Sequence, residues 1–239
     1  METTTKETCT KNDSVVSDTG ECVAVAGTSG YLICKRFADL VFALAAGVIF
    51  LIPMLIIGVL VKLDSKGPAI FKQERLGQDG RPFVIYKFRS MVENAEADGP
   101  KWAEVNDNRC TRLGRILRKS RLDELPQLIN IIKGDMSFIG PRPLLVKYLP
   151  LYSEHQRKRH LVRPGLSGLA QVSGRNVLNW QDRLNLDVEY VHNISLALDI
   201  KVFFMTISAV LKREGISSET SATMEAFTGN PKEAETVEI

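Results

Sequence analysis

The chain has 239 residues, of which 44% are hydrophobic and 25% charged, and its formal net charge is +3. This length suits one domain of ordinary size with additional terminal segments, and a net charge so close to zero does not by itself indicate a polyanionic partner. The four cysteines form no Cys-x-x-Cys pair and no Cys/His cluster, so the usual zinc-site spacings are excluded and we expect free thiols in a reducing compartment.

Both ends of the chain have the composition of unstructured segments. Residues 1–30 are rich in Thr, Ser and Gly without helical periodicity, which predicts a flexible N-terminal tail. They also lack the charged, apolar and cleavage regions of a signal peptide in the expected order. Residues 214–239 contain six glutamates and no apolar repeat, so we predict a disordered acidic tail there.

A long apolar segment follows the N-terminal tail. Phe37–Val61 contains a single charge, Asp39, and as one helix it would reach about 37 Å, enough to span a hydrocarbon core of about 30 Å. Pro53 removes a helical hydrogen bond, and Lys and Arg residues flank both ends, which disfavours translocation of either end. Residues 31–63 are therefore predicted to insert in a membrane, either as a spanning helix or as a re-entrant helix-break-helix that turns at Ile52-Pro53.

Two short strands are predicted after this segment. Ala69–Gln73 and Pro82–Arg89 have strand-like composition, and the Asp-Gly pair within Gly77–Gly80 is a turn signal. With a period of two, Lys87 and Arg89 leave the same face of the second strand. They are either solubilising charges on an exposed edge strand or two cations that bind an anionic ligand.

The centre of the chain joins a cationic run to two adjacent carboxylates. Six of the thirteen residues in Arg109–Arg121 are Lys or Arg and none is acidic, so a phosphate-rich ligand would neutralise this stretch. Helical spacing predicts an amphipathic helix with Arg115 and Arg118 on its cationic ridge. Asp123 and Glu124 follow directly, and their alternative role is that of solvated carboxylates at the start of a second helix.

Three further segments have a distinctive pattern. In Gly140–Pro143 the two prolines stiffen the backbone around Arg142, which would present its guanidinium at low entropic cost. Arg163–Asn176 is glycine-rich and permits close backbone approach to a ligand, but it has neither the P-loop nor the dinucleotide-binding pattern. Ile194–Leu211 is nearly free of charge and contains small polar residues, which suits a helix that lies in the membrane interface.

Four of these segments resemble the bacterial sugar transferase family, the monotopic phosphoglycosyl transferases of bacterial glycan assembly. The resemblance runs from about Tyr31 to Gly215, and the motifs occur in the order of the family. They are Lys87–Met91, Leu122–Gln127, Gly134–Pro143 and Arg163–Asn176.

The resemblance implies a reaction and its residues. The family moves a sugar-1-phosphate from a UDP-sugar to undecaprenyl phosphate and releases UMP. Asp123 would be the nucleophile that forms an aspartyl-phosphosugar, and Glu124 would bind Mg2+, alone or together with Asp123. The residues expected to bind the substrate are Lys87, Arg89, Arg115, Arg118, Arg142 and Arg175.

The resemblance also implies the setting of the protein. Such enzymes carry out the first membrane step of exopolysaccharide or related glycan synthesis at the bacterial inner membrane, with the catalytic domain on the cytoplasmic face. The resemblance to this family implies that the membrane segment is re-entrant. Relatives usually carry Ser before the proline, however, where this chain has Ile52.

We therefore predict a membrane-anchored α+β protein that is mainly helical, with a small β-hairpin, an N-terminal re-entrant helix-break-helix and interfacial amphipathic helices. The cytoplasmic catalytic domain would comprise residues 64–213. Expected partners are the UDP-sugar, undecaprenyl phosphate and membrane lipids, but not nucleic acid, because the basic stretch lacks interleaved aromatic residues. The alternative function is a membrane-anchored module that binds a polyanion or lipid without turnover. The identity of the sugar and the existence of a homodimer are left open.

Overall fold

The computed structural model describes residues 14–16, 22–24, 29–93, 95, 107–174, 178–211 and 226–229. Most of the predicted N-terminal tail lies outside these residues, but Ser14–Val16 (β1) and Cys22–Ala24 (β2) pair as antiparallel strands within it. The helices that follow are α1 (Ser29–Ile49), α2 (Leu51–Asp64), α3 (Arg112–Ser120), α4 (Leu128–Lys133), α5 (Glu154–Arg157), α6 (Leu169–Ser173), α7 (Trp180–His192) and α8 (Leu196–Leu211). The strands are β3 (Ile70–Leu76), β4 (Pro82–Phe88), β5 (Ser137–Ile139) and β6 (Gly165–Ser167), and the 3-10 helices are η1 (Gln78–Gly80), η2 (Leu122–Gln127), η3 (Val146–Leu151) and η4 (Lys158–Leu161). The α+β class and the mainly helical content are as predicted.

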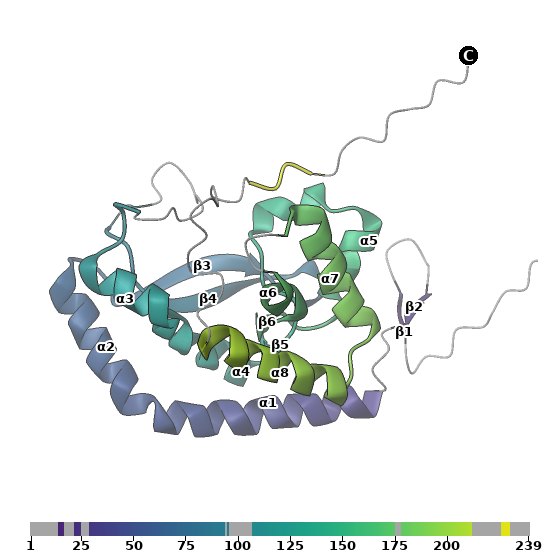
Figure 1. Cartoon of the computed structure of the whole chain (residues 1–239), viewed down its shortest axis with the longest axis horizontal. Coiled ribbons are helices and arrows are strands. Elements are labelled where there is room, and N and C mark those ends of the chain that lie inside the picture. The colour runs from purple at the N-terminus through teal and green to yellow at the C-terminus, as the bar shows by residue number, and fades with distance from the viewer. Residues whose placement is uncertain are drawn as a thin grey trace, which may run out of the picture.

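The predicted apolar segment forms two helices that run along one side of the molecule (Figure 1). α1 and α2 meet at Phe50 and are bent by 62°. The break lies earlier than the predicted turn at Ile52-Pro53, because Pro53 occupies the first turn of α2, where its missing N–H has no helical partner in any case. Within the described part of the chain, no single helix is both long and apolar enough to cross a bilayer, whereas the bent pair together passes that test of length and composition.

α1 is attached to the rest of the protein near its N-terminal end. The Arg36 guanidinium donates to the carbonyl oxygens of Ile131 and Ile132, at 2.6 and 2.9 Å, at the end of α4. The buried carboxylate of Asp39 accepts a hydrogen bond from the amide of Phe138, in β5, at 3.1 Å. The one charge within the apolar segment therefore fixes α1 to the folded body that contains β5.

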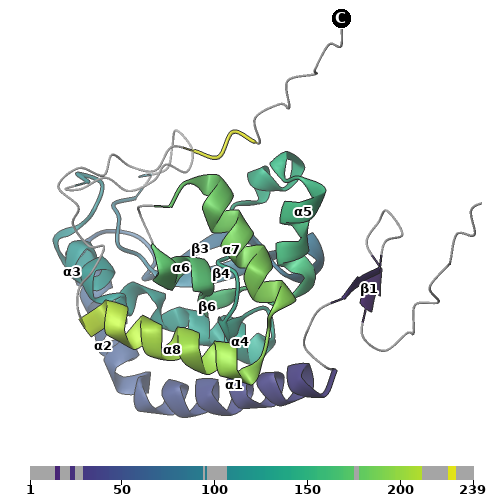
Figure 2. The same ribbon diagram turned by 45° about the vertical axis from the view of Figure 1, so that its right-hand side comes forward.

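A second buried carboxylate attaches α1 to α8. Asp199 accepts hydrogen bonds from the hydroxyls of Tyr31 and Tyr190, each at 2.6 Å, and pairs with the ammonium group of Lys35 at 2.5 Å. α8 lies beside α1 in both ribbon views (Figures 1 and 2). The predicted interfacial segment Ile194–Leu211 is thus a helix, held in place by the acidic residue that interrupts its apolar sequence.

The three helices α1, α2 and α8 present a large apolar surface to the exterior. Large apolar side chains are exposed along α1 and α2 from Ile33 to Leu63, and along α8 from Leu196 to Val210. Exposed apolar surface of this extent, concentrated on one set of helices, is typical of a site that contacts a membrane or another protein.

The predicted hairpin is present as β3 and β4, which pair antiparallel from Ile70 opposite Phe88 to Leu76 opposite Pro82. Its turn contains Asp79 and Gly80 with φ of 56° and 69°, as the Asp-Gly signal indicates.

The second edge of β4 is closed by a side chain from α4. Asn130, which is fully buried, accepts from the amide of Tyr86 at 3.1 Å and donates to the carbonyl of Val84 at 2.7 Å, as a neighbouring strand would. Its amide nitrogen also donates to Asp135 at 3.2 Å. Asn130 therefore fixes the segment η2–α4 to the strand that carries Lys87.

Replacement of Asn130 with Ala should lower the free energy of unfolding by about 3 kcal/mol, because it leaves two backbone groups of β4 buried without partners. Chemical denaturation of the detergent-solubilised protein measures this loss. The matched control is Ile129→Ala, at an adjacent position with a 46% exposed side chain, where we expect a loss below about 1 kcal/mol. Equal losses at the two positions would contradict the role of Asn130 at the strand edge.

Part of the predicted acidic tail is packed against the domain. Of residues 214–239, the structure describes 226–229, and Phe227 among them is buried in a core cluster with Tyr148 and Tyr152. The prediction of a disordered tail is therefore wrong for these four residues. A single aromatic side chain in an acidic sequence produces no periodic signal from which this packing could be predicted.

Candidate active site

The cationic run contains the helix α3, as predicted. A single residue, Arg121, separates the end of α3 from the start of η2. Thr111 caps the helix by accepting from the amide of Gly114 at 2.9 Å. Arg121 adopts a left-handed conformation, with φ of 60°, and turns the chain into η2. Ser120 does not cap this second helix, because its hydroxyl donates back to the carbonyls of Ile116 and Leu117 in α3.

The two adjacent carboxylates of η2 are buried. Asp123 is 6% exposed and Glu124 is 8% exposed, so the alternative of solvated carboxylates at a helix start is wrong. Burial of two ionisable groups side by side costs free energy unless cations or hydrogen bonds compensate it. The surrounding groups therefore decide what this pair can do.

Glu124 is compensated by two cations that reach it from distant parts of the chain. Its Oε1 atom lies 3.0 Å from Nζ of Lys87, on β4, and 2.9 Å from Nη2 of Arg142, in the loop after β5. Burial by itself raises the pKa of Glu124, but the charges of Arg142 and Lys87 outweigh it and hold the pKa well below its usual range. These two cations therefore favour the ionised form of Glu124.

Asp123 lies in the same cationic surroundings but is less well compensated. Burial raises its pKa, the neighbouring charge of Glu124 raises it further, and the charges of Lys87, Arg118 and Arg121 oppose the shift without cancelling it. Among the described residues, the buried Oδ1 atom accepts no hydrogen bond. A carboxylate oxygen that is destabilised and unpartnered is well suited to form a new bond to an electrophile.

Arg142 is held by a buried residue that the sequence did not reveal as part of the site. Nη2 of Arg159 donates to the carbonyl oxygen of Arg142 at 2.6 Å and to Oδ2 of Asp187 at 2.7 Å. Both partners of the Arg159–Asp187 pair are almost fully buried. Their signal in the sequence was weak, because Arg159 occurs in a basic stretch near Lys158 and Asp187 lies on a helix of mixed polarity, 28 residues away.

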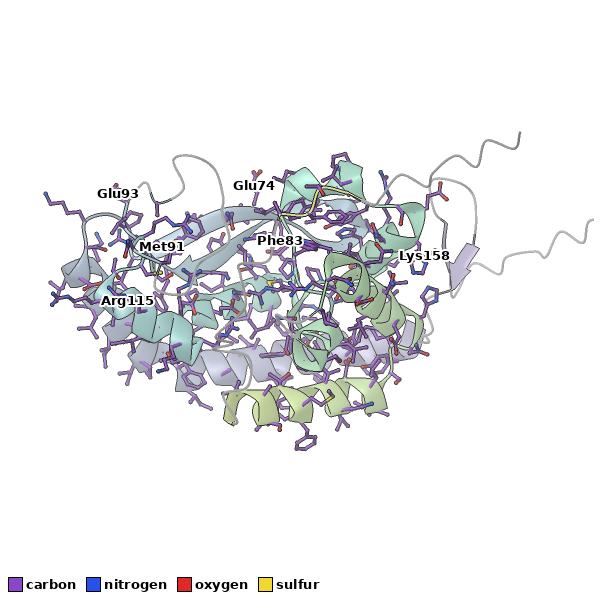
Figure 3. All side chains as sticks on the ribbon, turned by 45° about the horizontal axis from the view of Figure 1, so that its top comes forward. Glu74, Phe83, Met91, Glu93, Arg115 and Lys158 are labelled. Atoms are coloured by element: carbon purple, nitrogen blue, oxygen red, sulfur yellow. The ribbon has the colours of Figure 1, made fainter. Side chains whose placement is uncertain are left out.

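Of the other cations predicted to bind the substrate, one lies near Asp123, one is exposed on α3 and one is outside the described residues. Arg118 lies near Asp123 and donates to the Cys110 sulfur at 3.2 Å. Arg115 is exposed on α3, at the opposite end of the molecule from Lys158 (Figure 3). Arg175 is outside the described residues.

Arg89 is directed to α2 and not to the carboxylate pair. Its guanidinium donates to the carbonyls of Val61 and Ser65, at 3.2 and 2.6 Å, and to the Ser65 hydroxyl at 2.9 Å. Gly67, with φ of 111°, gives this side chain room, since a Cβ atom there would lie 2.3 Å from Nη1 of Arg89. The contacts of Lys87 and Arg89 thus diverge, and substrate binding by Arg89 stays a prediction.

The carboxylate pair also bears on the predicted Mg2+. Within the described ranges, no group of three or more His, Cys, Asp or Glu side chains is placed to hold a metal ion. Mg2+ commonly uses one or two carboxylates together with water and substrate phosphate oxygens. Glu124, which stays ionised, and the unpartnered Oδ1 of Asp123 fit a Mg2+ ion of that kind.

Comparison with known proteins identifies several close relatives. The uncharacterized sugar transferase EpsL of Bacillus subtilis is 44% identical over 199 residues, which cover 83% of this chain and 98% of EpsL. A UDP-N-acetylgalactosamine-undecaprenyl-phosphate N-acetylgalactosaminephosphotransferase of Aeromonas hydrophila is 43% identical over 76% of this chain and 44% of its own length. A UDP-glucose:undecaprenyl-phosphate glucose-1-phosphate transferase of Caulobacter vibrioides is 40% identical over 74% of this chain and 69% of its own length.

This chain therefore spans nearly the whole of EpsL but less than half of the Aeromonas protein. The family model described as bacterial sugar transferase matches residues 30–213, which include both carboxylates, the hairpin and α1, α2 and α8. The chain belongs to the bacterial sugar transferase family.

Proposed function

We propose that the protein is a phosphoglycosyl transferase that moves a sugar-1-phosphate from a UDP-sugar to undecaprenyl phosphate and releases UMP. The observation that carries the proposal is the buried, unpartnered Asp123 carboxylate beside Glu124, which Lys87 and Arg142 hold as an anion. The relatives named above as undecaprenyl-phosphate transferases support the same donor and acceptor classes. A module that only binds a polyanion needs the cations but has no use for two buried carboxylates.

In the first step, an oxygen of Asp123 attacks the β-phosphorus of the UDP-sugar. A bond forms between this oxygen and phosphorus, and the bond from the β-phosphorus to the bridging oxygen breaks. That oxygen leaves with the electron pair as part of UMP, so the product is an aspartyl-phosphosugar. Lys87, Arg118 and Arg121, whose charges act on Asp123, would offset the negative charge that accumulates as two anions approach.

In the second step, a phosphate oxygen of undecaprenyl phosphate attacks the phosphorus of the intermediate. The aspartyl oxygen–phosphorus bond breaks, Asp123 is restored as a carboxylate, and the product is a sugar linked to the lipid by a diphosphate. The covalent intermediate divides one transfer between two anions into two separate displacements.

Glu124, alone or together with Asp123, would hold a Mg2+ ion. Such an ion, when bound, neutralises phosphate oxygens and stabilises the departing UMP. Lys87 and Arg142 would keep Glu124 ionised and oriented for that role.

The helix pair α1–α2 is proposed to enter the inner membrane and return to the cytoplasmic face, with α8 in the interface. Two contacts support a re-entrant path over a spanning one. α1 is joined to the catalytic body near its start, through Lys35 and Asp199, and α2 is joined to it at its end, through Arg89 and Ser65. Both ends of the pair therefore contact the same folded body, while the exposed apolar residues between them face outward.

The proposed activity is tested by UMP release from the detergent-solubilised full chain. With Mg2+, undecaprenyl phosphate and the correct UDP-sugar, we expect sustained release. Without the lipid, we expect a burst of about one UMP per active chain, because the intermediate cannot be discharged. UDP-glucose, UDP-galactose and their N-acetylated forms form the donor panel. Absence of any release from this panel would instead favour the binding module.

A further inference from the structure

Three aromatic side chains form a socket on the side of the domain that carries η3 and α7. Tyr148, Tyr152 and Trp180 surround the ring of Phe227, with centroid distances of 5.8, 5.8 and 5.3 Å. The Phe227 side chain is 5% exposed and packs in the same cluster as Leu144. Aromatic rings at these separations attract one another in addition to the stabilisation from burial.

The described residues on either side of Phe227 contribute little to the packing. Ala226 and Thr228 on either side are exposed. Gly229 has a φ of 104°, and a Cβ atom built there would lie 3.9 Å from Leu151. The described part of this segment has no regular secondary structure. One side chain therefore accounts for most of the burial of residues 226–229, which is the pattern of a docked peptide.

The socket is continuous with the residues that hold Arg142. Leu144, two residues after Arg142, belongs to the Phe227 cluster, and its carbonyl accepts from the amide of Leu76 at 2.9 Å. The Tyr152 ring lies 5.9 Å from the guanidinium carbon of Arg159, and Arg159 donates to the Arg142 carbonyl. Two independent contacts thus lead from the socket to the cation that pairs with Glu124.

We propose that Tyr148, Tyr152 and Trp180 form a docking socket for the C-terminal segment of this same chain, and that Phe227 in the socket is a positioning residue for Arg142. Phe227 touches no reacting atom. It fills the cluster against which the Arg142 segment rests, so its departure lets that segment move and weakens the Arg142–Glu124 pair. The coupling to Arg142 rests on the proposed function, whereas the docking itself does not.

Docking is tested by the fluorescence of Trp180 in the full chain. The sequence contains two tryptophans, so a Trp102→Phe background leaves Trp180 as the single emitter. In this background, Phe227→Ala should shift the emission to longer wavelength, and a synthetic peptide of residues 222–233 should reverse the shift. The matched control Thr228→Ala, at the exposed neighbouring position, should emit as the background does. Unchanged emission in Phe227→Ala would overturn the docking. A native emission that shifts on dilution would assign the occupant to a second copy and overturn the intramolecular assignment.

The coupling between Phe227 and Arg142 is tested by measuring the amplitude of the UMP burst and the rate of UMP release separately. For Phe227→Ala we expect a burst amplitude equal to that of the native chain and a rate about tenfold lower, equal to about 1.4 kcal/mol of activation free energy. The peptide with Phe227 should restore the rate, and the same peptide with Ala at that position should not. A lower amplitude at native rate would reflect lost folding alone, and an unchanged rate would show that docking is uncoupled from Arg142; either result overturns the positioning role.

If the native chain releases no UMP, the proposed function fails, and hydrogen exchange still tests the inference. Phe227→Ala should then accelerate amide exchange in residues 144–152 while exchange in α3 stays at the native rate. Equal exchange in residues 144–152 of the variant and native chains would overturn the positioning role independently of activity.

Discussion

Replacement of Asp123 with Asn should abolish UMP release and at the same time raise the thermal midpoint of the protein. The loss of activity should be at least about 10³-fold, because the amide cannot form the covalent intermediate. The gain in stability follows from the raised pKa of Asp123, whose causes are burial and the adjacent Glu124 charge. UMP release and thermal unfolding of the same detergent-solubilised sample measure the two effects.

The sign of the stability change depends on which state favours the charged carboxylate. The folded-state pKa of Asp123 lies above its unfolded value, so ionisation destabilises the fold at every pH above the unfolded pKa, and the penalty is relieved as the pH falls through the folded pKa. A neutral Asn removes this penalty at neutral pH. Such an exchange of stability for function is common where an active site keeps a charge in a destabilised state.

Glu124→Gln is the matched control, because its pKa is shifted in the opposite direction. The charges of Arg142 and Lys87 outweigh the burial of Glu124, so its ionised form stabilises the fold above the unfolded pKa, and this stability is lost only as the pH falls through the depressed folded pKa. At neutral pH we therefore expect Glu124→Gln to lower the thermal midpoint. A lower thermal midpoint in both variants would contradict our inference that the ionised Asp123 carboxylate destabilises the fold.

Replacement of Arg159 with Met should destabilise the protein by about 3–5 kcal/mol, because it leaves the Asp187 carboxylate buried without its partner. Both side chains of this pair are almost fully buried, and their atoms approach to 2.7 Å. For a domain of about 200 residues, such a loss lowers the thermal midpoint by about 10 °C. Thermal unfolding and UMP release again measure stability and activity separately.

The double variant Arg159→Met, Asp187→Leu separates the two roles of Arg159. An apolar pair of similar volume should recover most of the lost stability, since no buried charge is left unpaired. The rate of UMP release should be below that of the native chain in both the single and the double variant, because both lack the hydrogen bond from Arg159 to the Arg142 carbonyl. Recovery of both stability and activity would show that Arg159 acts on folding alone.

The elements that depend on local sequence were predicted from the chain itself. The hairpin β3–β4 follows from strand composition and the Asp-Gly turn, α3 follows from helical periodicity, and α8 follows from its nearly charge-free composition. The break between α1 and α2 was expected because of Pro53, but it occurs at Phe50. A proline in the first turn of a helix starts that helix, so the bend precedes the proline.

The contacts that join distant segments could not be predicted. The sequence placed Lys87 and Arg89 on one strand face, but only the packing of α2 against the hairpin sends Arg89 to the α2 carbonyls while Lys87 reaches Glu124. Asn130 closing the edge of β4 and Arg159 holding Arg142 are side-chain-to-backbone bonds across 46 and 17 residues. Neither hydrogen bond produces a periodic pattern in the sequence, because each depends on the tertiary packing of a single residue.

The most direct test of the proposed mechanism is to trap the intermediate on Asp123. The full chain is incubated with its UDP-sugar and Mg2+ in the absence of undecaprenyl phosphate, then quenched, digested and analysed by mass spectrometry. Our account predicts that the peptide containing Asp123 gains the mass of one sugar phosphate, and that subsequent addition of undecaprenyl phosphate to an unquenched sample removes it. Sustained UMP release without such an adduct, or an adduct on another side chain, would contradict the account.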